Sequence, residues 1–363
     1  MSSLASLHHT WLGGLLVHLI MVGSWVWGWV PPVLLVFLTA DHTRGFSALI
    51  FAIIFCPSKR GRRAIAATVV AICVCMGPWN PASASFKRYW VSAGCMAFMC
   101  IMTWFWTLTP RPGFKQFMQD LDFKKYFAAC ELRGALDEIR KEGSIFGFHP
   151  HGVVCIGSAW NAGWSKEFED VAGTTHFLGE RRLVEDNPLF KAIADLHGAI
   201  GTLNKENLLE HLGRRDNIGM TPGGFEDATA LEFGAQRTVT FQRSAFIKYA
   251  LQHGYRVHPV YTFGETETYH TPYTGALGFR FWLNSKKFPA PIFWGLSWAP
   301  FLPLTKARIL TYVGKAIQLP KVEDPSLEEV ERWHGVYIAA LIQVFADNKV
   351  EAGLPKSAKL EIW

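Results

Sequence analysis

Residues Ser144 to Gly152 read Ser-Ile-Phe-Gly-Phe-His-Pro-His-Gly, an apolar run that leads directly into two imidazoles. The run has the length and composition of a buried strand, and Pro150 and Gly152 are typical of the turn that follows one. In open α/β sheets, ligands gather at the carboxyl ends of the strands. The stretch therefore predicts a strand of a central sheet with a functional turn at its end.

Similar apolar runs recur towards the C-terminus, with helical patterns between them. The predicted strands are Ser144–Phe148, Ala199–Leu203, Ile218–Thr221, Tyr255–Phe263 and Ile309–Val313, and the predicted helices are Leu189–Leu196, Glu206–Leu212 and Phe241–His253. A closing helix begins after Ser326, which forms a capping-box pattern with Glu329. Strands that alternate with helices indicate an α/β fold with a mostly parallel central sheet, flanked by helices on both faces.

The N-terminal third has a different composition. Residues 1–110 hold seven Lys or Arg and one acid, and so account for the whole formal net charge of +6. Positively charged loops beside membrane segments explain this surplus of Lys and Arg. Nucleic-acid binding explains it less well, because residues 111–363 have no stripe of basic residues. The Pro110–Gly113 segment marks the boundary between two predicted domains, a membrane-embedded helical region over 1–110 and a catalytic domain over 111–363.

The apolar stretches of this region predict a membrane hairpin. Residues Trp11 to Ala40 contain no Asp, Glu, Lys or Arg, and the Pro31-Pro32 pair divides them. We expect Trp11–Val30 to form the first limb and Val33–Phe55 a broken, partly interfacial return limb. The basic run Lys59–Arg63 would then face the cytosol. Two further oily stretches, Ala64–Trp79 and Val91–Thr109, leave the number of membrane spans open.

His151 has the chemistry that acyl transfer to an alcohol requires. A base must remove the hydroxyl proton as the oxygen attacks a thioester, and an imidazole with a pKa of about 6.5 suits this at neutral pH. Pro150 restricts the backbone on both sides, and Gly152 permits close approach to a ligand. The turn would hold His151 at a defined angle, with a backbone N–H near Gly152 as a candidate oxyanion donor.

Other interpretations of the two histidines stay open on the residues alone. Either ring can be a hydrogen-bonded core residue, and the pair can supply two zinc ligands. A catalytic zinc needs a third ligand, and none stands nearby at motif spacing. Seven cysteines, with Cys73-x-Cys75 lacking a second pair, indicate neither a disulfide framework nor a metal site. We favour a structural His149 and a chemical His151, and expect no metal or resident cofactor.

Four blocks in order resemble the diacylglycerol acyltransferase type 2 family, which includes monoacylglycerol and wax-alcohol acyltransferases. The first is His149-Pro150-His151-Gly152 after the apolar strand, and the second, Pro222 to Glu226, is similar to the family's Pro-Gly-Gly-x-x-Glu block. The third runs from Arg243 through Lys248 and Pro259 to Glu265. The fourth combines Val313-Gly314-Lys315, Leu319-Pro320 and Gly353-Leu354-Pro355. Together they cover about residues 120–363.

The resemblance implies a cytosol-facing catalytic domain behind an N-terminal hairpin, with acyl-CoA as donor substrate and His151 as base. It points to Glu226 as a partner that orients the imidazole, as in triad logic, although an acid at a helix N-terminus has a structural explanation too. Gly223 and Gly224 are candidate sites of backbone approach to an anion or carbonyl. The remaining candidates for substrate binding are Pro150, Arg243, Lys248 and Glu265. Of these, the cations Arg243 and Lys248 are expected to bind the phosphates of CoA.

One departure concerns related glycerolipid acyltransferases, which carry an Asp five residues after the catalytic His. Positions 154 and 156 are Val and Ile here, so that dyad is absent. The favoured activity is the esterification of diacylglycerol to triacylglycerol. The same chemistry on monoacylglycerol or a long-chain alcohol is the nearest alternative, ahead of a metal-dependent hydrolase or a membrane-shaping hairpin protein. Expected locations are the endoplasmic reticulum membrane and lipid droplets; acyl-chain preference and homo-oligomer formation stay open.

Overall fold

The structure is a computed structural model of the full chain. It describes residues 11–27 and 106–363, apart from 242–243, 272–274 and 287–289, together with isolated positions between 63 and 101. The chain divides into two compact units. Unit 1 comprises Met1–Leu19, Gly113–Gly179 and Leu203–Trp363, and unit 2 comprises Ile20–Pro112 and Glu180–Thr202. The predicted division at residue 110 stays a prediction.

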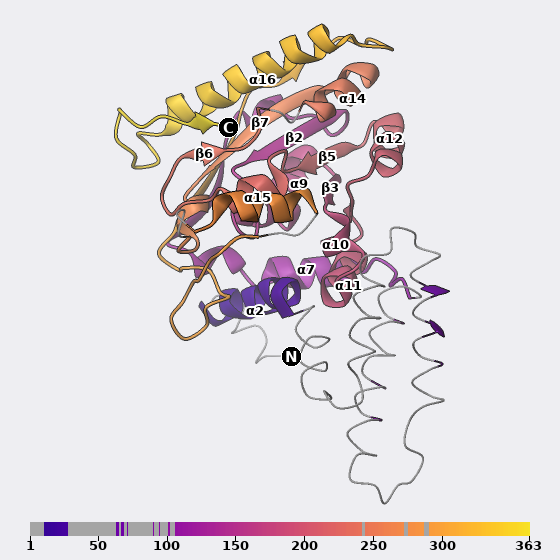
Figure 1. Ribbon diagram of the computed structural model, residues 1–363, viewed down its shortest axis with the longest axis vertical. Helices are drawn as coiled ribbons and strands as arrows, with labels where there is room; N and C mark the ends of the chain where they lie inside the picture. The colour runs from indigo at the N-terminus through magenta and orange to yellow at the C-terminus, as the bar shows by residue number, and fades with distance from the viewer. Residues whose placement is uncertain are drawn as a thin grey trace, which may run out of the picture. The chain divides into compact units, whose positions relative to one another are not determined.

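The sheet of unit 1 has β2 near its centre, between two parallel neighbours (Figure 1). Its strands follow the order β1, β8, β7, β2, β5, β3, with bounds Ala129–Gly134, Arg308–Val313, Arg256–Phe263, Ser144–His149, Asn217–Met220 and Thr175–Gly179. All neighbours on this path are parallel except β7 and β8. The short strand β9, Ile317–Gln318, adds antiparallel to β7. The predicted mostly parallel sheet is confirmed.

Helices connect and cover these strands, as buried parallel sheets require. The α-helices of the C-terminal part are α7 Pro112–Asp120, α8 Ile156–Ser158, α9 Lys166–Ala172, α10 Arg181–Val184, α11 Pro188–His197, α12 Lys205–Arg214, α13 Gly224–Thr229, α14 Ala245–His253, α15 Leu277–Ser285 and α16 Leu327–Asn348. Shorter helical turns are η2 Phe123–Tyr126, η3 Leu136–Glu138, η4 Ala159–Gly163 and η5 Glu265–Glu267. The remaining strands are β4 Ile200–Thr202, β6 Arg237–Thr238 and β10 Glu361–Ile362.

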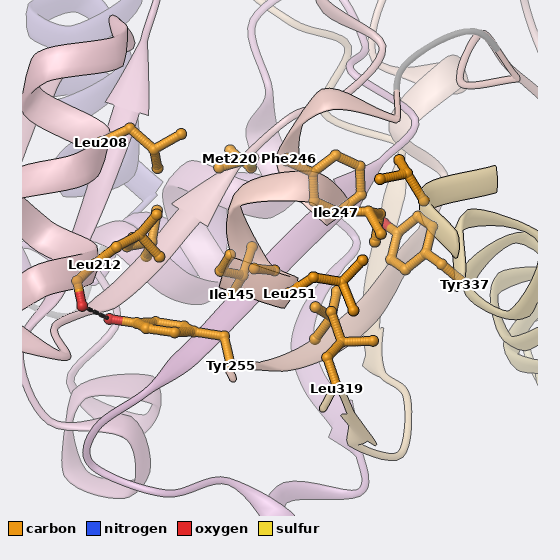
Figure 2. Packing of buried hydrophobic residues seen from close by; sticks show 14 of the residues in the cluster. Ile145, Leu208, Leu212, Met220, Phe246, Ile247, Leu251, Tyr255, Leu319 and Tyr337 are labelled. Carbon is orange, nitrogen blue, oxygen red and sulfur yellow. Dashed lines mark hydrogen bonds between the residues drawn. The ribbon is translucent and has the colours of Figure 1, made fainter. Parts of the chain in front are cut away.

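The largest core cluster lies between the sheet and the helices α12, α14 and α16 (Figure 2). Ile145 of β2 is fully buried in it, beside Leu251 of α14 and Tyr337 of α16. The neighbouring residues Phe146 and Phe148 belong to a second cluster, which includes Phe168 of α9. Successive side chains of a strand point to opposite faces. Therefore Ile145, Gly147 and His149 share the face that α16 covers.

All five predicted strands and all four predicted helices are present. The capping box at the start of α16 is confirmed, since Ser326 Oγ accepts from the Glu329 N–H and Glu329 Oε2 accepts from the Ser326 N–H. One boundary differs. The helix predicted from Phe241 begins at Ala245, because the preceding segment pairs with the C-terminus: β6 pairs with β10, and the N–H groups of Thr240 and Phe241 donate to Trp363 O.

Helix α2 spans Trp11–Trp27, within the predicted first limb Trp11–Val30. Its His18 is fully buried, accepts a hydrogen bond from Trp160 Nε1 at 2.8 Å and stacks on the ring of Tyr126. Among the helices that the structure describes, none combines the length and the apolar character needed to cross a bilayer. The predicted return limb Val33–Phe55 and most of the later oily stretches lie outside the described residues.

Unit 2 contains α10, α11 and β4 together with the chain on either side of Arg111. The Arg111 N–H donates to Leu196 O, and the Leu108 N–H donates to Asp195 Oδ2. This segment is therefore hydrogen-bonded to the C-terminal end of α11. Asn187 caps α11 with its side chain and donates to Ser24 O. These contacts give the unit its own polar framework.

Candidate active site

Three adjacent parallel strands end at one edge of the sheet, and each is followed by a block singled out in the sequence. β2 leads to His149 and His151, β5 leads to the Pro222 turn, and β7 leads through Gly264 to Glu265. The register pairs His149 with Tyr261 of β7 and Gly147 with Met220 of β5. Blocks separated by more than a hundred residues in sequence therefore meet where ligands gather in such sheets.

His151 is half-buried in the turn after β2. Its Nδ1 lies 2.9 Å from the carbonyl oxygen of Gly152, which can only accept, so Nδ1 carries the proton. Nε2 is then the unprotonated nitrogen, with its lone pair available to accept a proton. Burial lowers the pKa of His151 below its ordinary value, against the opposing effect of the Gly152 carbonyl. The ring is therefore neutral at pH 7, in the tautomer that a general base needs.

The carboxylate that holds this turn belongs to Asp227 of α13. Its Oδ2 accepts from the backbone N–H of His151 at 2.8 Å and from the Thr238 hydroxyl at 2.9 Å, and Oδ1 accepts from the Val239 N–H at 3.2 Å. Asp227 is almost fully buried, and this burial raises its pKa to about 6 in spite of the three donors. Asp227 thus fixes the backbone of His151 rather than its ring.

His149 occupies a closed polar network beneath α16. Its Nδ1 lies 2.9 Å from Thr238 Oγ1 and its Nε2 lies 2.8 Å from the Tyr337 hydroxyl. Since the Thr238 hydroxyl donates to Asp227, it accepts from His149 Nδ1–H, and Tyr337 must donate to Nε2. The ring is fully buried, which lowers the pKa of His149 to about 3, with the nearby His334 acting in the same direction. This imidazole is neutral and has both nitrogens engaged.

Glycine at position 147 makes room for that network. A Cβ there would collide with the Tyr337 hydroxyl, and the next contact, the Tyr337 Cζ atom, would lie at 3.1 Å. Tyr337 is fully buried and comes from the helical pattern of α16, in which the sequence marks it only as an apolar position. The network therefore depends on a glycine and a tyrosine that are 190 residues apart.

Glu265 lies on the other side of the turn, at the end of β7. Its two carboxyl oxygens accept from the N–H groups of Ile156 and Gly157, at 2.9 and 2.7 Å. Burial raises the pKa of Glu265 to about 8. Gly152 has φ of +66°, and a Cβ at that position would collide with the Glu265 carboxyl group. Only glycine fits this place, for both conformational and steric reasons.

The Pro222-Gly223-Gly224 turn supports Asp227. A Cβ at Gly223 would lie 2.5 Å from Asp227 Oδ2, and Gly224 has φ of +53°. The Gly224 N–H already donates to Thr221 O at 3.2 Å, which makes this N–H a turn donor in the present geometry. The roles proposed for Gly223 and Gly224 towards an anion or carbonyl stay predictions.

The other candidate residues lie in different settings. Glu226 is half-buried on α13, next to the carboxylate that engages the histidine turn, and its predicted orienting role stays a prediction. Lys248 is exposed on α14, whereas Arg243 lies outside the described residues. Pro150 follows His149 through a cis peptide bond and is buried in the turn. Roles of Pro150, Arg243 and Lys248 in substrate binding stay predictions too.

Three members of the site were missed in the sequence: Asp227, Thr238 and Tyr337. A signal for Asp227 was present, because the family block has two residues between Gly-Gly and its acid, and that count reaches position 227 rather than 226. Thr238 and Tyr337 have no such signal. A threonine in a turn-rich segment and a tyrosine on an apolar helical stripe are ordinary, and only the folded chain brings them to His149.

The metal hypothesis for the histidine pair finds no support in the geometry of His149, whose two nitrogens already have partners. Elsewhere in the described part of the chain, ligand atoms of His176, His211 and Asp216 lie within 4.8 Å of one another. Arg214 Nε donates to Asp216 Oδ2 at 3.0 Å, and His211 Nδ1 lies 2.8 Å from the same oxygen. An ion-paired cluster therefore explains this arrangement without a metal.

The fold is that of an α/β protein in which a neutral, half-buried imidazole lies at the carboxyl edge of a mostly parallel sheet. The chain belongs to the diacylglycerol acyltransferase family, because the family model with the description "Diacylglycerol acyltransferase" matches residues 91–363. That match includes every strand and helix of the site.

Individual relatives agree with this family. The chain is 30% identical over 259 residues to diacylglycerol O-acyltransferase 2 of Xenopus laevis, which covers 66% of this chain and 70% of that protein. It is likewise 30% identical over 254 residues to acyl-CoA wax alcohol acyltransferase 1 of Mus musculus, with 65% and 75% covered. The crystal structure of a 1-acyl-sn-glycerophosphate acyltransferase from Thermotoga maritima aligns at a TM-score of 0.35 and 11% identity, over 91% of this chain and 99% of that chain. So loose a superposition supports no statement about function.

Proposed function

We propose that this chain is an acyl-CoA-dependent O-acyltransferase that esterifies diacylglycerol to triacylglycerol, with His151 as general base. Membership of the family and the names of its relatives support the reaction class. The observation that carries the assignment of the base is the tautomer of His151, whose Nδ1 proton is committed to Gly152 O. This leaves Nε2, on a half-buried ring at the end of β2, as the proton acceptor.

In the proposed reaction, His151 Nε2 takes the proton of the lipid hydroxyl as its oxygen attacks the thioester carbonyl of acyl-CoA. The tetrahedral oxyanion collapses, the carbon–sulfur bond breaks, and CoA leaves as a thiolate that recovers the proton from Nε2. The developing imidazolium is stabilised by Gly152 O, which accepts from Nδ1–H. Positioned base catalysis of this kind contributes typically about 10²–10⁴-fold. No resident cofactor is needed for these steps.

The nearest alternative keeps the chemistry and changes the acceptor. A wax alcohol acyltransferase is as similar in identity as a diacylglycerol acyltransferase, so a long-chain alcohol is a second candidate acceptor, with monoacylglycerol as a third. We place the enzyme at the endoplasmic reticulum membrane and at lipid droplets, with residues 1–110 as the membrane-embedded region. The acid-poor, apolar composition of that region supports this location.

An acceptor panel tests the proposal. Full-length protein in detergent receives labelled acyl-CoA with diacylglycerol, monoacylglycerol or a long-chain alcohol, and His151→Ala is run in parallel. We expect triacylglycerol from wild type and about 10²–10⁴-fold less from the variant. Preference for the alcohol would overturn the acceptor assignment, and unchanged turnover by His151→Ala would overturn the base. Turnover abolished by a strong chelator would instead favour a metal-dependent mechanism.

A further inference from the structure

Helix α15 is labelled in Figure 1. This helix and the segment that follows it expose several large aromatic side chains. On α15, Phe279 and Trp282 are 60% and 54% exposed, and their rings stack with centroids 5.6 Å apart. In the following segment, Ile292, Trp294 and Trp298 are 44%, 47% and 63% exposed. Single exposed apolar residues are normal, but several that follow one another on a short stretch mark an interaction surface.

Two large polar residues of α15, Arg280 and Asn284, point inwards instead. Arg280 is buried and donates to three backbone carbonyls, those of Thr229, Gly275 and Ala290. Asn284, one turn later, is also buried and exchanges hydrogen bonds with the Thr229 side chain. A surface helix of a water-soluble protein has the opposite pattern, with its charges outside and its large apolar residues inside. The outer face of α15 is therefore built for apolar surroundings.

The charges of this stretch fit a phospholipid surface. From Thr268 to Lys306 the sequence contains no Asp or Glu, and apart from the buried Arg280 it has three cations, Lys286, Lys287 and Lys306. Tryptophan is the residue that prefers the boundary between lipid and water, and cations beside it meet lipid phosphates. A second protein copy would not by itself require the complete exclusion of acids.

The buried side of α15 is in contact with an element of the candidate active site. α15 packs against α13, where Asn284 Nδ2 donates to Phe225 O in the turn of Gly223 and Gly224. Asp227 of α13 in turn binds the backbone N–H of His151 at 2.8 Å. Two layers of direct contacts thus connect the outer helix with the proposed base.

We propose that the exposed face of α15, together with Ile292–Trp298, lies in the lipid–water interface and receives the lipid acceptor beside His151. The part played by the acceptor rests on the proposed function, whereas contact with the membrane does not. A lipid alcohol stays in the membrane, so an enzyme that takes it there needs its active site at the surface. The surface defined by α15 and Ile292–Trp298, called the α15 surface below, supplies that contact.

Photo-crosslinking tests the membrane contact independently of catalysis. Full-length protein is reconstituted in vesicles of phosphatidylcholine and phosphatidylserine that contain a diazirine-bearing phosphatidylcholine, and adducts are mapped by mass spectrometry. We expect adducts on peptides from 277–285 and 292–298, and far fewer on α16. Absence of adducts on the α15 surface would overturn the proposal. Protein–protein crosslinks there, to a second copy or to another segment of this chain, would do so as well.

Kinetics tests the link to the acceptor. The double variant Phe279→Ser/Trp282→Ser is compared with Leu327→Ser/Ile342→Ser, which removes two exposed apolar side chains from α16. With diacylglycerol in vesicles, we expect kcat/KM of the α15 variant to fall by about tenfold, mainly through KM. With a short-chain diacylglycerol dispersed in detergent, it should match wild type, as the α16 variant should under both conditions.

The outcomes separate this proposal from the reaction assigned above. Equal losses of kcat/KM in vesicles and in detergent would show that the α15 variant acts through a folding defect or through α13, and would overturn the membrane role. Thermal unfolding of the variants detects a folding defect. Failure of wild type to esterify any acceptor would overturn the proposed function, whereas lipid adducts on the α15 surface would still establish its membrane contact.

Discussion

The end of strand β2 and the turn that follows it carry the same side chain, two residues apart, in opposite environments. His149 at the strand end is fully buried, with Thr238 on one nitrogen and Tyr337 on the other. His151 in the turn is half-buried, and the one hydrogen bond of its ring to the described residues is to the backbone carbonyl of Gly152. The residue type is constant, so the difference in chemistry comes from the surroundings.

This contrast suits the two imidazoles of one motif to different roles. A fully hydrogen-bonded imidazole cannot accept a further proton without losing a partner, so His149 is suited to hold the site together. An imidazole with one nitrogen committed and the other unprotonated is suited to proton transfer. A chain of hydrogen bonds joins the two histidines: His149 contacts the Thr238 hydroxyl, which donates to Asp227, and Asp227 accepts from the backbone N–H of His151. The strand end therefore positions the turn.

The largest expected effect separates the two histidines directly. His151→Ala should lower kcat by about 10²–10⁴-fold and leave the thermal unfolding temperature close to that of wild type. His149→Ala should lower the unfolding temperature clearly, since it leaves Tyr337 and Thr238 without their partner in a buried site. Esterification rates and unfolding of full-length protein in detergent measure both quantities. His253→Ala, on the last turn of α14, is the matched control and should change neither.

The assignment would be reversed by the opposite result, in which His149→Ala abolishes turnover at wild-type stability. Equal and complete loss of folding in both variants would show that the two imidazoles are not functionally distinct, contrary to the contrast drawn from their burial.

Asp227→Asn sharpens the link between the two regions. The amide retains one acceptor oxygen in place of two, so its NH₂ group must face a donor N–H at Val239 or His151. A displaced His151 should lower kcat by roughly 10²-fold, because small errors in the position of a catalytic group are costly. KM for acyl-CoA should change little. Steady-state kinetics with both substrates is the measurement, and a larger loss in Glu226→Gln would contradict the role given to Asp227.

A double-mutant cycle examines the strand end alone. Gly147→Ala should destabilise by about 1–3 kcal/mol, because its methyl group collides with the Tyr337 hydroxyl. Tyr337→Phe should cost about 1–3 kcal/mol, because it leaves His149 Nε2 without a donor. The double variant should lose less than the sum, since removal of the hydroxyl makes room for the methyl group. Denaturant unfolding measures the three variants, and simple additivity would refute this packing.

The last prediction is a pH dependence of stability that belongs to His149 and changes by no more than about 1.4 kcal/mol over one pH unit. Its pKa is about 3 in the folded chain and about 6.5 when unfolded, so between these values the unfolded chain binds one more proton. This contribution to stability is fully present above pH 6.5 and falls by up to about 1.4 kcal/mol per pH unit below it. His149→Gln should lack this slope.

The stability of wild type must be compared with that of His149→Gln, because Asp227 and Glu265 change the stability with pH in the opposite direction. Their raised pKa values of about 6 and 8 give stability at low pH that is lost as pH rises. Both groups are common to wild type and His149→Gln, so the difference between the two unfolding curves reports on His149. Parallel curves from about pH 4 to 6.5 would argue against a neutral, buried imidazole at this position.

Much of the fold followed from local pattern. The strand that ends at His149 and the helix that starts after Ser326 were readable, because a buried parallel strand is continuously apolar and a capping box is a local signal. Strands β1 and β3 were not predicted. β1 reads Ala-Cys-Glu-Leu-Arg-Gly and β3 reads Thr-His-Phe-Leu-Gly, and their polar residues hide a pairing that only the sheet supplies.

The same limit applied to the site. The histidine turn and Gly152 were recognisable, since Pro and Gly restrict the backbone in ways that sequence shows directly. The sequence singled out Glu226, whereas the carboxylate that binds the backbone of the histidine turn is that of Asp227. Which of two neighbouring carboxylates meets the turn depends on the side of α13 that faces it. The α15 surface was missed, because residues 277–285 read as a helix of mixed polarity until Arg280 and Asn284 are seen to point inwards.

The sequence by itself determined the strands and helices with a strong local pattern, the position of the histidine turn and the family to which the chain is similar. These properties depend on periodicity, on special backbone residues and on spacing, which are local along the chain. Tertiary structure alone decided which histidine has a free nitrogen, which acid supports it and which face of α15 is apolar. Those properties depend on partners brought from up to 190 residues away, and burial gives each group its protonation state and its exposure.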